Sequence, residues 1–197
     1  MDAVIIDSGG ANLASLQFAF ERLGAKTQVT ADADEILAAP RVILPGVGSA
    51  GDAMARLRGK QVASLLPALK QPVLGICLGM QLLFERSEEG DTECLGILPT
   101  SVRRLEPKDG QPVPHMGWNQ LSLVREDPLL SGITPNDYVY FVHSFAAPVS
   151  DVTLASAEYG TTLSAVVRRG NFWGTQFHPE RSAQVGARVL ANFLKLA

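Results

Sequence analysis

Short apolar runs alternate with helical patterns through the first half of the chain. Residues 3–6 form an apolar run that ends at Asp7 and leads into Ser8 and two glycines. Asn12 then precedes a stretch with helical spacing that stops at Gly24. The apolar positions of this stretch are Leu13, Leu16, Phe20 and Leu23. The pattern predicts a strand, a glycine turn and a helix capped by Asn12.

Three more apolar runs follow, at 26–29, 41–44 and 73–76. The last of them leads through a glycine-flanked turn at Cys77 into a predicted helix at 80–85. Strands that alternate with helices at this spacing favour right-handed βαβ units. Such units build a parallel sheet that is covered on both faces.

The second half of the chain has a different pattern, with short apolar segments separated by prolines. Candidate strands lie at 102–105 and 138–142, and a hairpin-like pair at 163–167 and 171–177. A closing helix is expected at 183–196, with a buried stripe of Val189, Leu190, Phe193 and Leu194. We therefore expect an α/β fold, in which an open, mostly parallel twisted sheet carries helices on both faces. An antiparallel, β-rich extension follows in the second half, and residues 1–197 are expected to form a single domain.

Composition narrows the class of protein further. The chain has 197 residues, of which 46% are hydrophobic and 19% charged, and its formal net charge is -3. Such a chain can bury enough apolar surface to fold, and it lacks the basic face of a nucleic-acid-binding protein. Cys77 and Cys94 have no zinc-site spacing and are too few for a disulfide framework. The apolar run at 3–6 is far too short to span a membrane, so we expect a cytoplasmic protein.

Cys77 stands in a GxCxG pattern between Gly75 and Gly79. A nucleophile on a sharp turn between a buried strand and a helix requires small neighbours two residues away on each side. The N-terminal amides of the following helix favour a thiolate and can stabilise an oxyanion. The alternative interpretation is a small apolar cysteine buried between a strand and a helix.

His178 is the candidate proton carrier for this thiol. Pro179 favours an extended conformation at His178, and residues i and i+2 of an extended chain point to the same side. Glu180 can therefore lie beside the imidazole, fix its tautomer and stabilise its protonated form. Alternatively, His178 is a turn residue and Glu180 a solvated carboxylate.

The LPGVG segment offers a second oxyanion donor. Gly46 and Gly48 allow unusual backbone dihedral angles, so the Val47 amide can turn toward the site or away from it. The segment follows a predicted parallel strand, at the edge of the sheet where α/β proteins bind ligands. An ordinary turn is the alternative. The early SGGAN segment lacks the GxGxxG spacing of dinucleotide-binding proteins.

These motifs together resemble a known family. GICLGMQ and QFHPE resemble the class I, triad-type glutamine amidotransferases. Six segments, in order, look like the glutaminase subunits of imidazole glycerol phosphate synthase: DSGGANLASL, LPGVGSA, GICLGMQLLFERSEE, PHMGWN, YFVHSFA and GTQFHPERS. PHMGWN is the most discriminating segment, because the triad alone does not identify the synthase that is served. The family often reads DYGxGN at the start, whereas this chain reads DSGGAN.

The resemblance implies roles for individual residues. Cys77 would attack the side-chain amide of glutamine, His178 would protonate the departing ammonia and then activate water, and Glu180 would orient His178. The amides of Leu78 and, after loop rearrangement, Val47 would hold the oxyanion. The residues implied to hold glutamine are Gly46, Gly48, Gln81, His143 and Ser144. No metal or organic cofactor is implied.

The resemblance also implies a partner. Ammonia would pass to a (β/α)8-barrel cyclase subunit in a heterodimer, which makes imidazole glycerol phosphate and aminoimidazole carboxamide ribotide in histidine biosynthesis. Expected interface residues are Met116, Trp118 and Asn119. Tyr138 is a weaker candidate for which packing comes first, and Arg181 fits a partner-facing ion pair or a solvated charge.

Two other functions stay open at this point. The same triad could serve a different synthase, such as those of anthranilate or pyridoxal phosphate synthesis. A catalytically silent regulatory protein could also use this fold.

Overall fold

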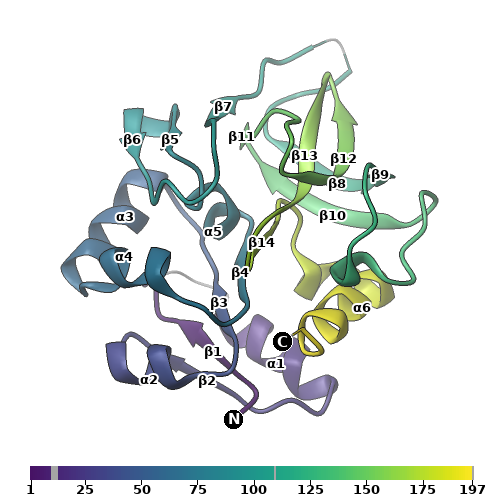
Figure 1. The fold of residues 1–197 in the computed structure, drawn as a ribbon. Coiled ribbons are helices and arrows are strands. Elements are labelled where there is room, and N and C mark those ends of the chain that lie inside the picture. Colours follow the sequence, from purple (N-terminus) through teal and green to yellow (C-terminus); the bar gives the residue numbers. More distant parts are fainter. Residues whose placement is uncertain (10–12, 109, 197) are drawn as a thin grey trace.

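A computed structural model describes residues 1–9, 13–108 and 110–196 (Figure 1). Its largest sheet has eight strands in the order β2-β1-β3-β4-β14-β13-β12-β9. The first five run parallel: β2 (Thr27–Thr30), β1 (Ala3–Ile6), β3 (Val42–Leu44), β4 (Val73–Ile76) and β14 (Phe172–Thr175). The predicted parallel sheet is confirmed, and the proposed cap Asn12 lies outside the described residues.

Each face of the parallel strands has its own apolar core. Alternate residues of a strand point to opposite faces, so Ile5 and Val4 of β1 belong to different clusters. The cluster of Ile5 contains the buried faces of α1 (Leu13–Arg22) and α6 (Ala183–Phe193). The cluster of Val4 contains residues of α2 (Ala33–Ala38), α3 (Ala50–Gly59) and α4 (Val62–Leu65), followed by the short 3-10 helix η1 (Leu66–Ala68). Helices therefore cover both faces, as the strand–helix alternation predicted (Figure 1).

Antiparallel strands extend this sheet. They are β13 (Thr161–Arg169), β12 (Thr153–Tyr159) and β9 (Ser122–Leu123). The hairpin-like pair is confirmed, because β13 and β14 run antiparallel with Arg169 opposite Phe172. β12 is a strand that the hydrophobic pattern did not predict.

Two smaller sheets accompany the large one. One pairs β8 (His115–Gln120) with β10 (Tyr138–His143), and the other has the order β11-β7-β5-β6. The strands of the latter are β11 (Phe145–Ala146), β7 (Ser101–Arg104), β5 (Arg86–Ser87) and β6 (Thr92–Glu93). The strands predicted at 102–105 and 138–142 are thus present within one residue. Short 3-10 helices complete the connections: η2 (Glu89–Asp91), η3 (Pro128–Leu130) and η4 (Pro179–Arg181).

The helix predicted at 80–85 is wrong. The observed helix, α5, spans Leu78–Gln81 and ends before most of the predicted range. The carbonyl of Leu82 accepts from the Leu95 N–H, and the carbonyl of Leu83 accepts from the N–H groups of Ile97 and Leu98. These carbonyls are therefore occupied by a later segment of the chain, and the backbone leaves the helix to meet it.

The closing helix is shorter than predicted. α6 ends at Phe193, and its buried residues include Val189, Leu190 and Phe193 of the expected stripe, whereas Leu194 is half-buried. No helix within the described part of the chain is long and apolar enough to cross a membrane.

Candidate active site

Cys77 lies on a sharp turn between β4 and α5. Its backbone has φ +52° and ψ −111°, a conformation that an L-residue rarely adopts. A Cβ at Gly79 would lie 1.8 Å from the carbonyl oxygen of Leu44, and one at Gly75 would lie 2.7 Å from that of Gly79. Both neighbours of the turn must therefore be glycine, which is the steric requirement read from the GxCxG pattern.

Sheet pairing places His178 beside Cys77. Parallel pairing of β14 with β4 sets Thr175 opposite Ile76, and the Cys77 N–H donates to the Thr175 carbonyl at 2.7 Å. The chain after β14 therefore runs alongside the cysteine turn. The His178 N–H donates to the carbonyl of Tyr140 at 3.0 Å, which ties this segment to β10 as well.

Glu180 holds the imidazole of His178. The backbone of His178 is extended, as Pro179 predicted, and its Nδ1 lies 2.8 Å from Oε1 of Glu180. The exposed fractions of the two side chains are only 7% and 4%. Burial by itself lowers the pKa of His178, but hydrogen bonds with Cys77 and Glu180 outweigh it and raise that pKa to about 10. The imidazole is therefore protonated at neutral pH and forms an ion pair with Glu180.

The predicted triad and glutamine-binding residues meet in one cavity of about 760 Å³. From the prediction, its lining includes Cys77, His178, Glu180, Gly46, Val47, Gly48, Leu78, Gln81, His143 and Ser144. Arg181, predicted as an interface residue, also lines it. Sequence reasoning missed the other lining residues, which are Ser15, Phe18, Arg22, Glu89, Val142 and Phe145.

Gln81 is buried, and its side-chain amide is committed within the protein. Its Nε2 donates to the carbonyl of Phe145 at 2.7 Å and to Oε1 of Gln176 at 3.0 Å. Both hydrogens of the amide group are thereby used. Toward a ligand in the cavity, Gln81 can therefore act only as a hydrogen-bond acceptor, through its Oε1.

Charged groups of both signs line the cavity. The carboxylate of Glu89 is half-buried, and its Oε2 accepts from the Ala50 N–H at 2.7 Å. Arg22 on α1 and Arg181 after the histidine contribute guanidinium groups. A cavity with a carboxylate and guanidinium groups matches the ammonium and carboxylate of a free amino acid. Glu89 belongs to the ERSEE segment of the family resemblance, and this segment was the available signal for it.

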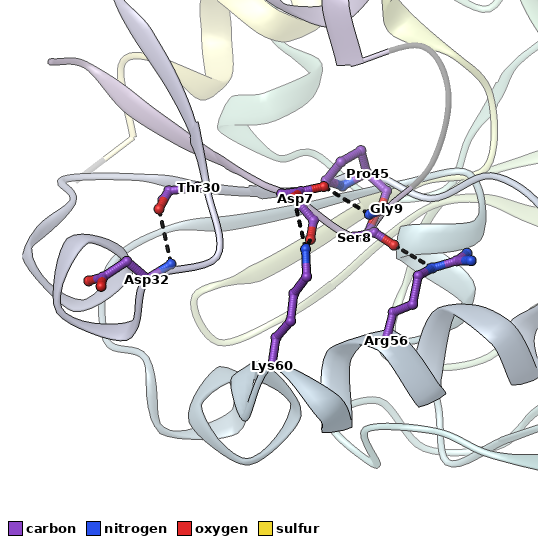
Figure 2. Close-up of polar contacts among 8 residues, drawn as sticks. All are labelled: Asp7, Ser8, Gly9, Thr30, Asp32, Pro45, Arg56 and Lys60. Carbon is purple, nitrogen blue, oxygen red and sulfur yellow. Dashed lines mark hydrogen bonds and ion pairs between the residues drawn. The ribbon is translucent and has the colours of Figure 1, made fainter.

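The start of the Gly46–Gly48 loop packs against the cysteine turn and is supported by the end of β1. A Cβ at Gly46 would lie 2.6 Å from the Gly79 nitrogen, so the two backbones are in direct contact. The hydroxyl of Ser8 donates to the carbonyl of Pro45 at 3.2 Å, and Arg56 Nε donates to the carbonyl of Ser8 at 2.7 Å (Figure 2). Gly48 has φ +89°, so the loop leaves this contact through a left-handed residue.

An ion pair from Lys60, the residue directly after α3, supports the end of β1. Lys60 Nζ lies 2.8 Å from Oδ2 of Asp7 and also donates to the Asp7 carbonyl (Figure 2). The hydrogen bond from Lys60 and that from the Gly9 N–H lower the pKa of Asp7. Residues 7–9 are therefore held by Arg56 of α3 and by Lys60, and through Ser8 they hold the loop that begins at Pro45.

The predicted interface residues lie on one face of the β8–β10 pair, with one exception. Met116, Trp118 and Tyr138 are 66%, 53% and 50% exposed, and the guanidinium of Arg181 lies 4.4 Å above the Tyr140 ring. The side chain of Asn119 points inward instead, where Nδ2 donates to the carbonyl of Glu158. This face adjoins the cavity, because Val142 of β10 lies opposite Met116 and also lines the cavity.

A metal site or a second reactive cysteine would be a further source of chemistry in this protein. Within residues 1–9, 13–108 and 110–196, no three His, Cys, Asp or Glu side chains are grouped so that they could hold a metal ion. Cys94 is buried away from the cavity, and burial raises its pKa to about 11. Its thiol is therefore protonated at neutral pH.

Comparisons with known proteins identify the family of the chain. Residues 4–197 match the family "Glutamine amidotransferase class-I". The chain is 55% identical over 196 residues to the imidazole glycerol phosphate synthase subunit HisH of Xanthomonas euvesicatoria pv. vesicatoria, covering 100% of this chain and 98% of the relative. The protein of the same name from Shewanella oneidensis is 52% identical over 212 residues, covering 99% and 96%.

Solved structures share the fold. A putative GMP synthase protein of Thermoplasma acidophilum superposes with a TM-score of 0.74 at 21% identity, covering 98% of this chain and 91% of that one. PurLQS of Thermotoga maritima gives a TM-score of 0.69 at 20% identity, covering 98% and 96%.

The fold and the family match make this chain a class I glutamine amidotransferase. Within that class it belongs to the HisH subunits of imidazole glycerol phosphate synthase. It is therefore an enzyme of histidine biosynthesis, and the alternative of a silent regulatory protein is not supported.

Proposed function

We propose that this protein hydrolyses glutamine with a triad of Cys77, His178 and Glu180 and supplies the ammonia to a synthase subunit. The observation that carries the proposal is the convergence of these three side chains in one cavity, with His178 and Glu180 in contact at 2.8 Å. Thiol, imidazole and carboxylate in this order are the parts of a nucleophilic acyl-transfer site.

The reaction begins when the Cys77 sulfur attacks the side-chain amide carbon of glutamine. A carbon–sulfur bond forms and the carbonyl π electrons move to the oxygen, which gives a tetrahedral oxyanion. The protonated imidazole of His178 then donates a proton to the amide nitrogen as the carbon–nitrogen bond breaks. Ammonia leaves, and the γ-glutamyl group remains on Cys77 as a thioester.

In the hydrolysis of the thioester, His178 acts as a base instead of an acid. Neutral His178 accepts a proton from water, and the resulting hydroxide attacks the thioester carbon. The carbon–sulfur bond breaks, glutamate is released and the thiolate–imidazolium pair is restored. Glu180 serves both half-reactions, because its contact with Nδ1 leaves Nε2 of His178 for the reacting groups.

The oxyanion is assigned to backbone amides. Within α5 the first amide with an intrahelical acceptor is that of Gln81, which donates to the Cys77 carbonyl, so the earlier amides lack such a partner. Leu78 is the first of these and lines the cavity. The Val47 amide is assigned as the second donor after rearrangement of its glycine loop, because Gly46 and Gly48 permit a peptide flip.

The amino-acid end of glutamine is assigned to the polar rim of the cavity. We assign Glu89, which lines the cavity, to pair with the α-ammonium, and Oε1 of Gln81 as a further acceptor. His143 and Ser144 also line the cavity. These contacts favour a free amino acid over a peptide, since an internal residue of a peptide carries no α-ammonium.

The partner is assigned to the exposed face of β8 and β10. Trp118, Met116 and Tyr138 form an apolar surface beside the cavity, and Arg181 stands at its edge with Asn119 supporting β8 from within. Exposed aromatic residues in fixed positions are favoured anchors of protein interfaces. We assign this face to the (β/α)8-barrel cyclase subunit of imidazole glycerol phosphate synthase, in keeping with relatives that are named as subunits of that synthase.

The deciding experiment uses the two-subunit enzyme. Cys77→Ala is expected to abolish glutamine-dependent synthesis and to leave synthesis from ammonium salts intact, because the barrel would still receive ammonia from solution. Loss of both activities would show that Cys77 has only a structural role. We also propose that the barrel subunit and its ligand drive the rearrangement of the Val47 loop, so glutamine hydrolysis should be faster in their presence. Equal rates with and without them would contradict this gating.

A further inference from the structure

A buried glutamine contacts the nucleophile from outside the cavity. Nε2 of Gln176 lies 3.8 Å from Sγ of Cys77, and its Oε1 accepts from Nε2 of Gln81 at 3.0 Å. Gln176 has no exposed surface and does not line the cavity. Its side chain therefore touches the sulfur without a route to the substrate. Leaving a buried amide without partners is costly, and both Nε2 and Oε1 of Gln176 have a hydrogen-bond partner.

The hydrogen bonds continue from Gln81 to two buried histidines. The carbonyl of Phe145 accepts from Gln81 and also contacts Nδ1 of His143 at 2.9 Å. Nε2 of His143 lies 3.0 Å from Nδ1 of His115, and Nε2 of His115 lies 3.4 Å from Nδ2 of Asn119.

The direction of these bonds is fixed at both ends. A carbonyl can only accept, so Nδ1 of His143 carries the hydrogen and Nε2 accepts. His115 must then donate through Nδ1, and its Nε2 accepts from the amide of Asn119. Both rings are neutral in this arrangement, and every bond donates toward the Phe145 carbonyl.

Packing holds the histidine pair rigidly. The ring of His115 is stacked between Phe141 at 4.6 Å and Tyr159 at 3.9 Å, with interplanar angles of 21° and 19°. His115 and Asn119 are the inward residues of β8, whereas Met116 and Trp118 on the same strand point outward. A displacement of β8 would therefore reach the Phe145 carbonyl through two rigid rings.

We infer that Gln176 is a positioning residue for the Cys77 sulfur, and that the His115–His143 pair fixes its orientation from strand β8. The inference rests on the proposed function, because it requires Cys77 to be the nucleophile. An N–H donor on the sulfur restricts its rotation and stabilises its anionic form. Gln81 and the Phe145 carbonyl transmit the position of the histidine pair to Gln176.

The test compares Gln176→Met with the unchanged chain in the two-subunit enzyme. Methionine has a similar length but lacks both the donor and the acceptor. We expect kcat for glutamine hydrolysis to fall about tenfold with KM unchanged within about twofold, since the substrate contacts are intact. Site-resolved alkylation of Cys77 by iodoacetamide at pH 7 should slow by about the same factor. Unchanged alkylation and unchanged kcat would overturn the inference.

A second variant tests the histidine pair in case Gln176→Met does not fold. His115→Phe keeps the stacked ring and removes both ring nitrogens. We expect alkylation of Cys77 and kcat to fall about threefold, with less than additive effects when both changes are combined. Normal values in this variant would overturn the role of the histidine pair.

The matched control removes a buried hydrogen bond that is not part of this network. Thr153→Val breaks the 2.8 Å contact between Thr153 and Ser164, both fully buried, and should cost stability without changing kcat or alkylation. Cys77→Ala distinguishes a failure of the proposed function from a failure of the positioning role. If it retained glutaminase activity, the proposed function would fail; if it lost activity while Gln176→Met stayed normal, only the positioning role would fail.

Discussion

Nδ1 of His178 lies 2.8 Å from Oε1 of Glu180, and the two side chains are almost completely shielded from water. A carboxylate at this distance stabilises the protonated ring, and together with Cys77 it outweighs the effect of burial on the pKa of His178. The proposed mechanism needs this protonated ring at the moment when ammonia leaves.

Glu180→Gln tests this pairing. The amide keeps the shape of the side chain but removes the negative charge, so the pKa of His178 should fall from its value of about 10. We expect kcat for glutamine hydrolysis to fall by about 10²- to 10⁴-fold. The pH–rate profile of the two-subunit enzyme checks this, with KM measured in parallel. A kcat within twofold of the unchanged enzyme would contradict the role of the carboxylate.

Stability should decline as the pH falls below neutrality. Burial lowers the pKa of His115 to about 4 and that of His143 to about 3, from an ordinary value of 6.5. The unfolded chain therefore binds more protons than the folded one between the unfolded and folded pKa values, so stability is lost as pH falls through that window. We expect a loss of about 2 kcal/mol per histidine between pH 7 and pH 5.

Denaturant unfolding at several pH values measures this slope. His115→Phe removes one of the two titrating groups, so the difference in slope between this variant and the unchanged chain isolates its contribution. Parallel curves for the two proteins would refute the assignment to His115. The raised pKa of His178 acts in a separate window, since its stabilisation is complete below pH 6.5 and is lost as pH rises to about 10.

Gly79→Ala should be strongly destabilising. The added Cβ would lie 1.8 Å from the Leu44 carbonyl oxygen, so the backbone of either β3 or the cysteine turn must move. We expect a loss of about 4 kcal/mol or more in the free energy of unfolding. Gly59→Ala is the matched control, because a Cβ there meets nothing within 4 Å and alanine is the better helix former. Similar unfolding free energies for the two variants would contradict the steric account.

Trp118→Ala should weaken partner binding without destabilising the subunit. The side chain is 53% exposed, so its removal should change the free energy of unfolding by about 0.5 kcal/mol or less. If Trp118 anchors the barrel subunit, its loss should raise the dissociation constant by about 30-fold or more. Titration of the two subunits by calorimetry measures this constant.

Leu37→Ala provides a control of equal exposure. Leu37 is also 53% exposed but lies on α2, far from the β8–β10 pair (Figure 1). It should leave the dissociation constant unchanged. Equal weakening by the two substitutions would argue that the partner does not dock on the β8 face.

Much of the fold could be predicted from local pattern. The strands at Ala3–Ile6 and Val73–Ile76 match their predicted bounds, because a short apolar run that leads into a turn with glycines indicates a buried strand. The helix after Cys77 could not be predicted correctly, because its length depends on where the distant Leu95 N–H donates. β8 was missed, since half of its residues face outward and HMGWNQ carries no apolar run.

The active site, like the fold, could be predicted from local sequence only in part. The cysteine turn and the extended His178 depend on sterics within a few residues, so glycine and proline spacing reveals them. Glu89 and Gln176 carry no comparable local signal. Glu89 enters the cavity from a 3-10 helix beside α3, and Gln176 is important only because β14 pairs with β4.

The sequence by itself therefore determined the alternation of strands and helices, the strained turn at Cys77 and the pairing of His178 with Glu180. Each of these follows from dihedral limits and side-chain direction over a short stretch of chain. Only the tertiary structure decided that His178 reaches Cys77 and that Gln176 supports its sulfur. Those contacts depend on the pairing of β14 with β4. That pairing is favoured because the complete sheet buries an apolar cluster on each of its two faces.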